Sequence, residues 1–262
     1  MGGPDPAHHP AHTQGEYAVR CEWGPVGAAA IVADLGPRDL AVVVDVLSFS
    51  TTVTVAVAAG ATVWPYRWKD DRAAAFAAEQ DAVLAVGRLE ARTPGSPPQA
   101  RVSLSPAEIG AAAAPGSRFV LPSPNGATIS AAIGEVGVPV VAGCLRNATA
   151  VARRVDAVLA AGGRVAVVPC GERWPDGSLR PAQEDWWGAG AILAALTAPV
   201  ALSAEALAAA DAYRAAGPGA LAASASGREL VAKGYADDVA VAGRLDADVV
   251  VPMLRDGAFV ST

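Results

Sequence analysis

An aspartate followed closely by three hydroxyl residues is the first feature of this sequence that indicates chemistry. The stretch 42–46 is apolar except for Asp45, which is typical of a strand buried on both faces. Ser50, Thr51 and Thr52 then open a stretch with helical character. Ligands of open α/β sheets bind where strands end, and a helix N-terminus favours phosphate, so Asp45 could hold a metal beside that phosphate. A capped helix after an ordinary strand-end aspartate explains the stretch equally well.

Three more turns that follow predicted strands carry polar residues in the matching place. They are Asn125-Gly126, Cys144 to Asn147, and Cys170-Gly171-Glu172. Because parallel strands end at one edge of a sheet, these turns and Asp45 together predict a ligand cleft at that edge. Each turn also has a simpler interpretation. Asn125 would be part of a turn and cap, Asn147 would be a cap, and Cys170 would be a small buried residue rather than a nucleophile.

Glu184 and Asp185 form a second acidic feature, at the start of an apolar helical stretch. Acids in a first turn complement the helix dipole, and each contributes roughly 0.3–1 kcal/mol. Alternatively, the pair coordinates Mg²⁺ together with Asp45, since magnesium prefers oxygen ligands and a substrate phosphate. Arg88 follows another predicted strand, where it either clamps an anion or is simply solvated.

All three histidines lie among the first 15 residues, in a segment rich in proline and glycine. We expect residues 1–15 to form a disordered tail, which either binds metal or is solvated. Residues 16–262 are expected to form one domain, or two lobes that meet near residues 170–185. A body without histidine excludes a Ser-His-Asp triad, a Cys-His pair, His-ligated zinc and a phosphohistidine intermediate. Acids, bases and metal ligands must then be Asp, Glu, Cys, Lys or Tyr side chains.

The formal charge of −6, without a basic stripe, argues against nucleic acid as a partner. The three cysteines, Cys21, Cys144 and Cys170, suit neither a disulfide framework nor a zinc site. No signal peptide or membrane-spanning run is apparent, so we expect a cytoplasmic protein without membrane partners. The expected partner is a small molecule, and alanine-rich helices would also suit a homodimer.

Strands and helices alternate between residues 40 and 170, which predicts an α/β fold with a mostly parallel sheet. The expected strands are 17–23, 41–46, 62–66, 82–86, 118–121, 139–142, 164–168 and 249–252. The first expected helix has Ser48 or Ser50 as its N-cap and ends before Gly60. The other expected helices are 70–78, one that starts at 105, 125–133, 148–161, 184–196, 204–215, 224–233 and 237–245. Residues 24–35 fit a helix or a strand, and residues 91–101 and 173–183 are expected to be loops.

Several short motifs occur in an order that, taken together, is far more specific than any one of them. The first are Asp45-Val46-Leu47, Thr51-Thr52, Asn125-Gly126, Asn147, and Glu184-Asp185 with Gly188-Ala189-Gly190. The later ones are Ser226-Gly227-Arg228-Glu229-Leu230, Gly234, Asp237-Asp238 and Val251-Pro252. From residue 42 to residue 257 the chain resembles the 2-phosphosulfolactate phosphatase (ComB-like) family. The resemblance implies a three-layer α/β/α fold and Mg²⁺-dependent removal of phosphate from 2-phospho-3-sulfolactate or a related acid, a step of coenzyme M biosynthesis.

The sequence departs from the family pattern in three places. Ser48-Phe49-Ser50 stands where the family usually has an arginine and an alanine after Asp-Val-Leu. Ser103-Leu104 replaces Gly-Asn before a Ser-Pro pair, and Ser123-Pro124 replaces Thr-Thr before Asn-Gly. The missing arginine bears on the substrate, since sulfonate and phosphate both bind a planar cation or an equivalent donor. A related phosphatase with a new substrate is therefore one of the expected outcomes.

We expect a magnesium-dependent phosphatase for a small phosphorylated acid. The expected metal ligands are Asp45, Glu184 and Asp185, and the expected catalytic side chains are Asp45, Cys170 and Glu184. The residues expected to bind the phosphate or the acid are Ser50, Thr51, Thr52, Arg88, Asn125, Gly126, Asn147, Gly171 and Glu172. The alternative is a non-catalytic protein that binds an anionic metabolite in the same cleft, with the acids serving as helix caps.

Overall fold

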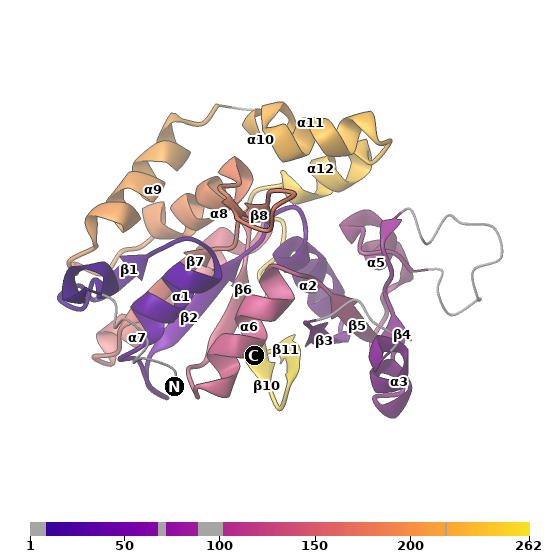
Figure 1. Ribbon diagram of the computed structural model, residues 1–262, viewed down its shortest axis with the longest axis horizontal. Helices are drawn as coiled ribbons and strands as arrows, with labels where there is room; N and C mark the ends of the chain where they lie inside the picture. Colours follow the sequence, from indigo (N-terminus) through magenta and orange to yellow (C-terminus); the bar gives the residue numbers. More distant parts are fainter. Residues whose placement is uncertain (1–8, 68–71, 89–101, 218) are drawn as a thin grey trace.

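The computed structural model describes residues 9–67, 72–88, 102–217 and 219–262. The loop predicted for residues 91–101 and the start of the helix predicted for 70–78 lie outside the described residues. Across these ranges, a nine-stranded sheet forms the centre of the fold and helices cover both of its faces (Figure 1).

The order of strands across this sheet is β1-β7-β2-β6-β10-β11-β3-β5-β4. In chain order the strands are β1 (Val19–Cys21), β2 (Leu40–Val44), β3 (Thr62–Tyr66), β4 (Val83–Leu84), β5 (Arg118–Pro122), β6 (Val140–Gly143), β7 (Val165–Pro169), β10 (Pro252–Arg255) and β11 (Ala258–Ser261). Two groups of parallel strands, β1-β7-β2-β6 and β3-β5-β4, flank the antiparallel hairpin β10-β11. The prediction of a mostly parallel sheet is therefore confirmed.

Helices pack on both sides of β2, which explains its continuous apolar run. The helices are α1 (Gly24–Val32), α2 (Phe49–Ala58), α3 (Arg72–Glu79), α5 (Pro106–Ala112), α6 (Gly126–Glu135), α7 (Ala148–Ala160), α8 (Gln183–Ala194), α9 (Ala204–Ala215), α10 (Ala220–Ala223), α11 (Ala225–Ala232) and α12 (Ala236–Ala242). Ala41 and Val43 join one buried cluster with α1, α2 and α6, while Val42 and Val44 join another with α7, α8 and α9. This alternation confirms the three-layer α/β/α prediction.

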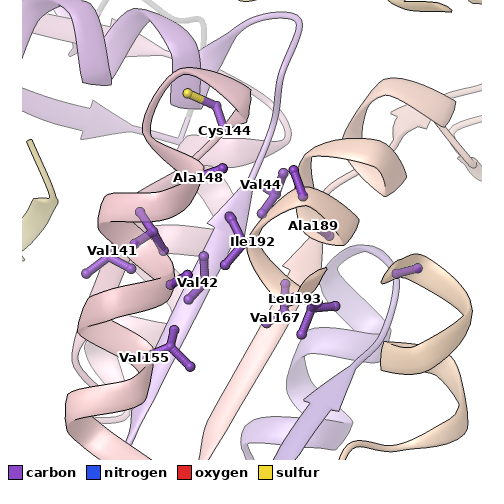
Figure 2. Close-up of a cluster of buried hydrophobic side chains, with 14 of the residues drawn as sticks. Val42, Val44, Val141, Cys144, Ala148, Val155, Val167, Ala189, Ile192 and Leu193 are labelled. Atoms are coloured by element: carbon purple, nitrogen blue, oxygen red, sulfur yellow. The ribbon is translucent and has the colours of Figure 1, made fainter. Parts of the chain in front are cut away.

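Close packing between α8 and the sheet fixes the position of the start of that helix. Figure 2 shows Ile192 of α8 lying beside Val42 of β2, among the buried side chains of α7 and β7. Gly143 at the end of β6 leaves the space that Ile192 fills. A Cβ added there would lie 2.7 Å from Ile192 Cδ1 and 2.8 Å from Val42 Cγ1. Nearer the start of α8, a Cβ added to Gly188 would lie 2.8 Å from Val44 Cγ1, so this part of the helix also lies directly against the end of β2.

The structure differs from the sequence predictions in several local elements. Residues 24–35, which fitted a helix or a strand, contain α1, and the predicted loop 173–183 contains part of a small hairpin, β8 (Glu172–Arg173) with β9 (Leu179–Arg180). Of the strand predicted for 249–252, only Pro252 lies in a strand, and the two-stranded hairpin β10-β11 begins at that residue. Its turn, Asp256-Gly257, has φ values of 49° and 82°, and such an Asp-Gly pair is a recognised hairpin signal.

The segment predicted as a tail, residues 1–15, is described only from residue 9. A short 3₁₀ helix, Pro10–Thr13, lies there, and the side chain of Gln14 is buried. Its amide accepts from the N–H of Cys21 at 3.0 Å and donates to the Cys21 carbonyl oxygen at 2.9 Å. Part of the predicted tail therefore packs against β1. Among the described helices, none is long and apolar enough to cross a bilayer.

Phe259→Ala is expected to destabilise the protein strongly. Phe259 is fully buried in the strand that joins the two parallel groups, with its ring centroid 6.0 Å from that of Phe49. Loss of such a ring leaves a cavity and lowers the free energy of unfolding by about 3–5 kcal/mol. Urea denaturation measures this change. Val249→Ala is the control, because Val249 is 89% exposed. Similar small losses in the free energy of unfolding for both variants would show that the packing of Phe259 contributes little to stability.

Candidate functional site

A cleft of about 160 Å³ lies where β2 and β5 end and where the chain leaves β7. Among the described residues, its polar lining consists of Asp45, Ser48, Thr52, Arg88, Ser123, Asn125 and Glu172. Three of the four predicted strand-end loops therefore meet, whereas no residue of the loop after β6 lines this cleft. Two larger hollows, of about 720 and 690 Å³, lie elsewhere: one beside the β10–β11 turn and α6, the other among mainly apolar residues of α8 to α12.

Asp45 follows β2 directly, and its carboxylate lies between the N-termini of two helices. Its Oδ1 accepts from the N–H of Phe49 at 3.0 Å, and its Oδ2 accepts from the N–H of Gly126 at 3.1 Å. These donors are the first residues of α2 and α6. A Cβ on Gly126 would lie 2.3 Å from Phe49 Cδ1, so only glycine permits this approach. Burial raises the pKa of Asp45 to about 6, although both N–H groups favour the ionised form.

The three hydroxyl residues after Asp45 are buried and serve mainly to hold the loop together. Ser50 Oγ accepts from the N–H of Asp45 at 3.1 Å, and Thr51 Oγ1 donates to the carbonyl oxygen of Val46 at 2.7 Å. Thr52 lines the cleft, and its hydroxyl donates to a carbonyl oxygen of the loop before α5 at 3.2 Å. Of the three residues expected to bind phosphate, only Thr52 is at the cleft.

Glu172 brings a second carboxyl group to the cleft from the first residue of β8. Asn125, at the end of the β5 loop, donates from its Nδ2 to Glu172 Oε2 at 2.9 Å. Burial raises the pKa of Glu172 to about 7, and the charge of Asp45 adds to the rise. The sequence grouped both residues as ligand-binding, and the structure brings them together as one hydrogen-bonded unit.

Asp185 and Glu184 have different surroundings although both belong to the first turn of α8. Asp185 Oδ1 accepts from the N–H of Val46 at 2.7 Å, and its Oδ2 accepts from the N–H of Gly171 at 2.9 Å. It thus ties α8 to the loops after β2 and β7, and burial raises its pKa well above the usual range. Glu184 is 1% exposed, and its Oε2 has no hydrogen-bond partner among the described residues.

Cys170 and Asn147 are placed away from the cleft. Cys170 lines an adjoining hollow of about 240 Å³ and is buried. Burial, with the nearby charges of Asp45 and Asp185, raises the pKa of its thiol well above the usual range. A thiolate nucleophile is disfavoured in such surroundings. Asn147 is fully buried and accepts from the N–H of Cys144 at 2.9 Å, so it shapes the loop after β6.

Arg88 enters the cleft and is held by residues that the sequence interpretation had not assigned to the site. Its Nε donates to Asp238 Oδ2 at 2.7 Å, and its Nη2 donates to Ser48 Oγ at 2.8 Å. Asp238 lies 150 positions further along the chain, in α12. Asp237-Asp238 is among the motifs of the family resemblance, but an acid at a helix start also complements the dipole, so only the fold reveals the contact with Arg88.

The donor set of this region suits a hard divalent cation. Asp45 and Glu172 line the cleft, and the buried Glu184 Oε2 lacks a partner within the described part of the chain. In the same part, no three His, Cys, Asp or Glu side chains form a ready-made ligand group. Mg²⁺ is commonly held by one or two carboxylates, with waters and substrate phosphate completing its shell. A partial set of protein ligands is therefore compatible with this ion.

The stability of the metal-free protein is expected to fall as the pH rises from about 4.5 to about 7. The folded-state pKa values of Asp45 and Glu172, about 6 and about 7, lie above the usual values of 3.8 and 4.5 for these side chains. Each group therefore favours folding while protonated, and this contribution is lost as the pH rises through the folded-state pKa. The slope of one group approaches ~1.4 kcal/mol per pH unit.

Urea denaturation in EDTA at pH 5, 6, 7 and 8 measures this dependence. Glu172→Gln should flatten the curve between pH 5 and 7, because the variant has no proton to lose there. Glu229→Gln is the control, since Glu229 is exposed and pairs with Lys233 on the surface. Equal slopes for the parent and Glu172→Gln would show that Glu172 does not titrate in this range.

Comparison with protein-family models matches residues 29–257 of the 262-residue chain to 2-phosphosulpholactate phosphatase. The matched region includes the cleft, from Asp45 to Glu172, and the Arg88 partner Asp238. A comparison with curated proteins found no match. The matched family acts on phosphoric monoesters as a hydrolase. With nearly its whole length covered and its α/β/α architecture in agreement, this chain belongs to the 2-phosphosulpholactate phosphatase family.

Proposed function

We propose that the protein is a magnesium-dependent phosphatase for 2-phospho-3-sulfolactate or a related small phosphorylated hydroxy acid. The observation that carries this proposal is the cleft in which Asp45, Glu172 and Arg88 meet. A volume of about 160 Å³ suits a small acid rather than a nucleotide or a peptide. The overall charge of the protein is negative, so an anionic substrate needs a local positive charge, and Arg88 provides it at the cleft.

Arg88 is the proposed binding partner of an anionic substrate group. The guanidinium presents several N–H donors in one plane, which matches the oxygens of phosphate, carboxylate or sulfonate. Thr52 and Asn125 line the same cleft and orient the rest of the acid. In this proposal Ser50, Thr51 and Asn147 act on the ligand only indirectly, since their polar atoms bond to the surrounding backbone and side chains.

Glu172 is the proposed proton donor to the leaving group. When water displaces the alcohol, a P–O bond forms to the water oxygen and the P–O bond to the substrate breaks. The departing alkoxide oxygen then needs a proton. A pKa of about 7 keeps a substantial fraction of Glu172 protonated near neutral pH, and Asn125 holds its carboxyl group at the cleft. Ordinary glutamates are ionised at this pH and have no proton to donate.

Asp45 and Glu184 are the proposed protein ligands of Mg²⁺, with Asp185 as a brace rather than a ligand. Both Asp45 and Asp185 accept two backbone N–H groups, but Asp45 lines the cleft and Asp185 does not. Glu184 Oε2 has no partner among the residues described. When bound, Mg²⁺ neutralises charge on the phosphoryl oxygens and lowers the pKa of a bound water. The charge of Glu184 adds to the raised pKa of Asp45, and a cation bound by both carboxylates would offset this repulsion.

The function is tested by phosphate release from a panel of phosphorylated hydroxy acids, with Mg²⁺ or with EDTA. We expect release that depends on Mg²⁺, a loss of more than about 100-fold for Asp45→Asn, and activity within about threefold of the parent for Cys170→Ser. The cysteine variant is a matched control, since Cys170 is equally buried near the same loops. Substrate that raises the melting temperature without turnover would support an anionic-metabolite-binding protein instead.

The metal ligands are tested by Mg²⁺-dependent melting of Glu184→Gln and Asp185→Asn. Stabilisation by a ligand follows its affinity for the folded state. Glu184→Gln should therefore lose most of the rise in melting temperature that Mg²⁺ gives the parent. Asp185→Asn should melt lower without metal, because it weakens two hydrogen bonds that join α8 to its neighbouring loops, yet keep the Mg²⁺ response. The reverse pattern would assign the metal to Asp185.

A further inference from the structure

We propose that Asp238 is a positioning residue that holds the Arg88 guanidinium in the orientation needed to bind the anionic group of the substrate. This inference rests on the proposed function and deepens it. It assigns a role at the site to α12, an element of the chain's C-terminal part whose own residues do not line the cleft. The argument depends on how many independent contacts fix the plane of Arg88.

Three contacts from two elements hold the guanidinium. Asp238 Oδ2 accepts from Arg88 Nε at 2.7 Å, and Ser48 Oγ accepts from Nη2 at 2.8 Å. The ring of Tyr235, one turn before Asp238, lies with its centroid 5.4 Å from Arg88 Cζ. Two hydrogen bonds fix rotation within the guanidinium plane, and the ring limits movement out of it.

The Asp238 carboxylate is itself held rigidly by α5. Its Oδ1 accepts from Ser105 Oγ and from the N–H of Ala107 at 3.3 Å. Ser105 is the N-cap of α5, and its hydroxyl also accepts from the N–H of Glu108 at 3.1 Å. A carboxylate anchored by one oxygen can present the other in a constant direction. Through Asp238, the guanidinium of Arg88 is therefore fixed relative to α5 and α12.

The charge balance of the pair agrees with this role. The side chain of Asp238 is 2% exposed, and that of Arg88 is 17% exposed. A buried carboxylate requires a counter-charge, so Asp238 keeps Arg88 from turning out into solvent. An arginine held in place before the ligand arrives loses less conformational entropy on binding. Arg88 is thus partly exposed, and it lines the cleft.

A purely structural interpretation is also defined by these contacts. In that case the ion pair would only fasten α12 to α5, and Arg88 would be an anchor without a ligand. The two interpretations differ in one measurable respect. If Asp238 acts through Arg88 on the ligand, its removal should have no further effect on ligand affinity once Arg88 is absent.

The experiment is a double-mutant cycle with Arg88→Ala, Asp238→Asn and the double variant, using inorganic phosphate as the probe in calorimetry. Asp238→Asn keeps the shape of the side chain and an oxygen for Ser105. We expect it to raise the phosphate Kd by about tenfold in the parent and to change it by less than about twofold in the Arg88→Ala background. In turnover assays, KM for the substrate should rise by about tenfold, with kcat within about threefold.

Melting temperatures of all variants separate this effect from loss of folding, and Arg88→Lys supplies a second variant that keeps the charge but not the planar fork. Glu229→Gln, which removes an exposed ion pair of α11, is the control and should leave Kd and KM unchanged. Equal effects of Asp238→Asn with and without Arg88, or a lower melting temperature with unchanged phosphate affinity, would overturn the proposal. Phosphate binding needs no turnover, so a parent that binds phosphate but hydrolyses no ester would reject the phosphatase and still test Asp238.

Discussion

The burial of several carboxylates at one edge of the sheet is the constraint on which this structure depends. A carboxylate out of water is costly unless hydrogen-bond donors or a cation compensate its charge. Asp45 obtains its donors from the first residues of α2 and α6, so both helices must begin at the cleft. Asp185 obtains its donors from the loops after β2 and β7. The need for these donors therefore organises the loops around the site.

The compensation is incomplete, and this agrees with a site built for a charged ligand. Burial and mutual repulsion raise the pKa values of Asp45 and Glu172 towards neutrality, and Glu184 Oε2 is without a partner in the described residues. Such an arrangement lowers the stability of the ligand-free protein. A bound cation would offset the repulsion, and stability would then depend on its concentration.

Two elements near the C-terminal end of the chain, the hairpin β10-β11 and the helix α12, contact residues of the site. The hairpin β10-β11 lies between the two parallel groups of strands, and Phe259 packs against Phe49, the residue that donates to Asp45. Asp238 of α12 accepts a hydrogen bond from Arg88, which lines the cleft. The C-terminal part of the chain therefore supports the cleft through the hairpin and through α12. The residues that could take part in chemistry nevertheless lie mostly in the first two-thirds of the chain.

The sequence by itself determined the layered α/β class and most strand and helix positions, because apolar periodicity is a local signal. It also identified Asp45, Asn125 and Glu172 as cleft residues, because polar residues directly after a strand are a local signal too. It further restricted the acids, bases and metal ligands to Asp, Glu, Cys, Lys or Tyr side chains, since residues 16–262 contain no histidine. Only the tertiary structure separated Thr52, at the cleft, from the similar Ser50 and Thr51, whose hydroxyls hold the loop. It likewise separated Glu184 from Asp185, and it brought Asp238 to Arg88. These distinctions depend on which donors and charges surround a side chain after folding, and residue type and spacing do not encode those surroundings.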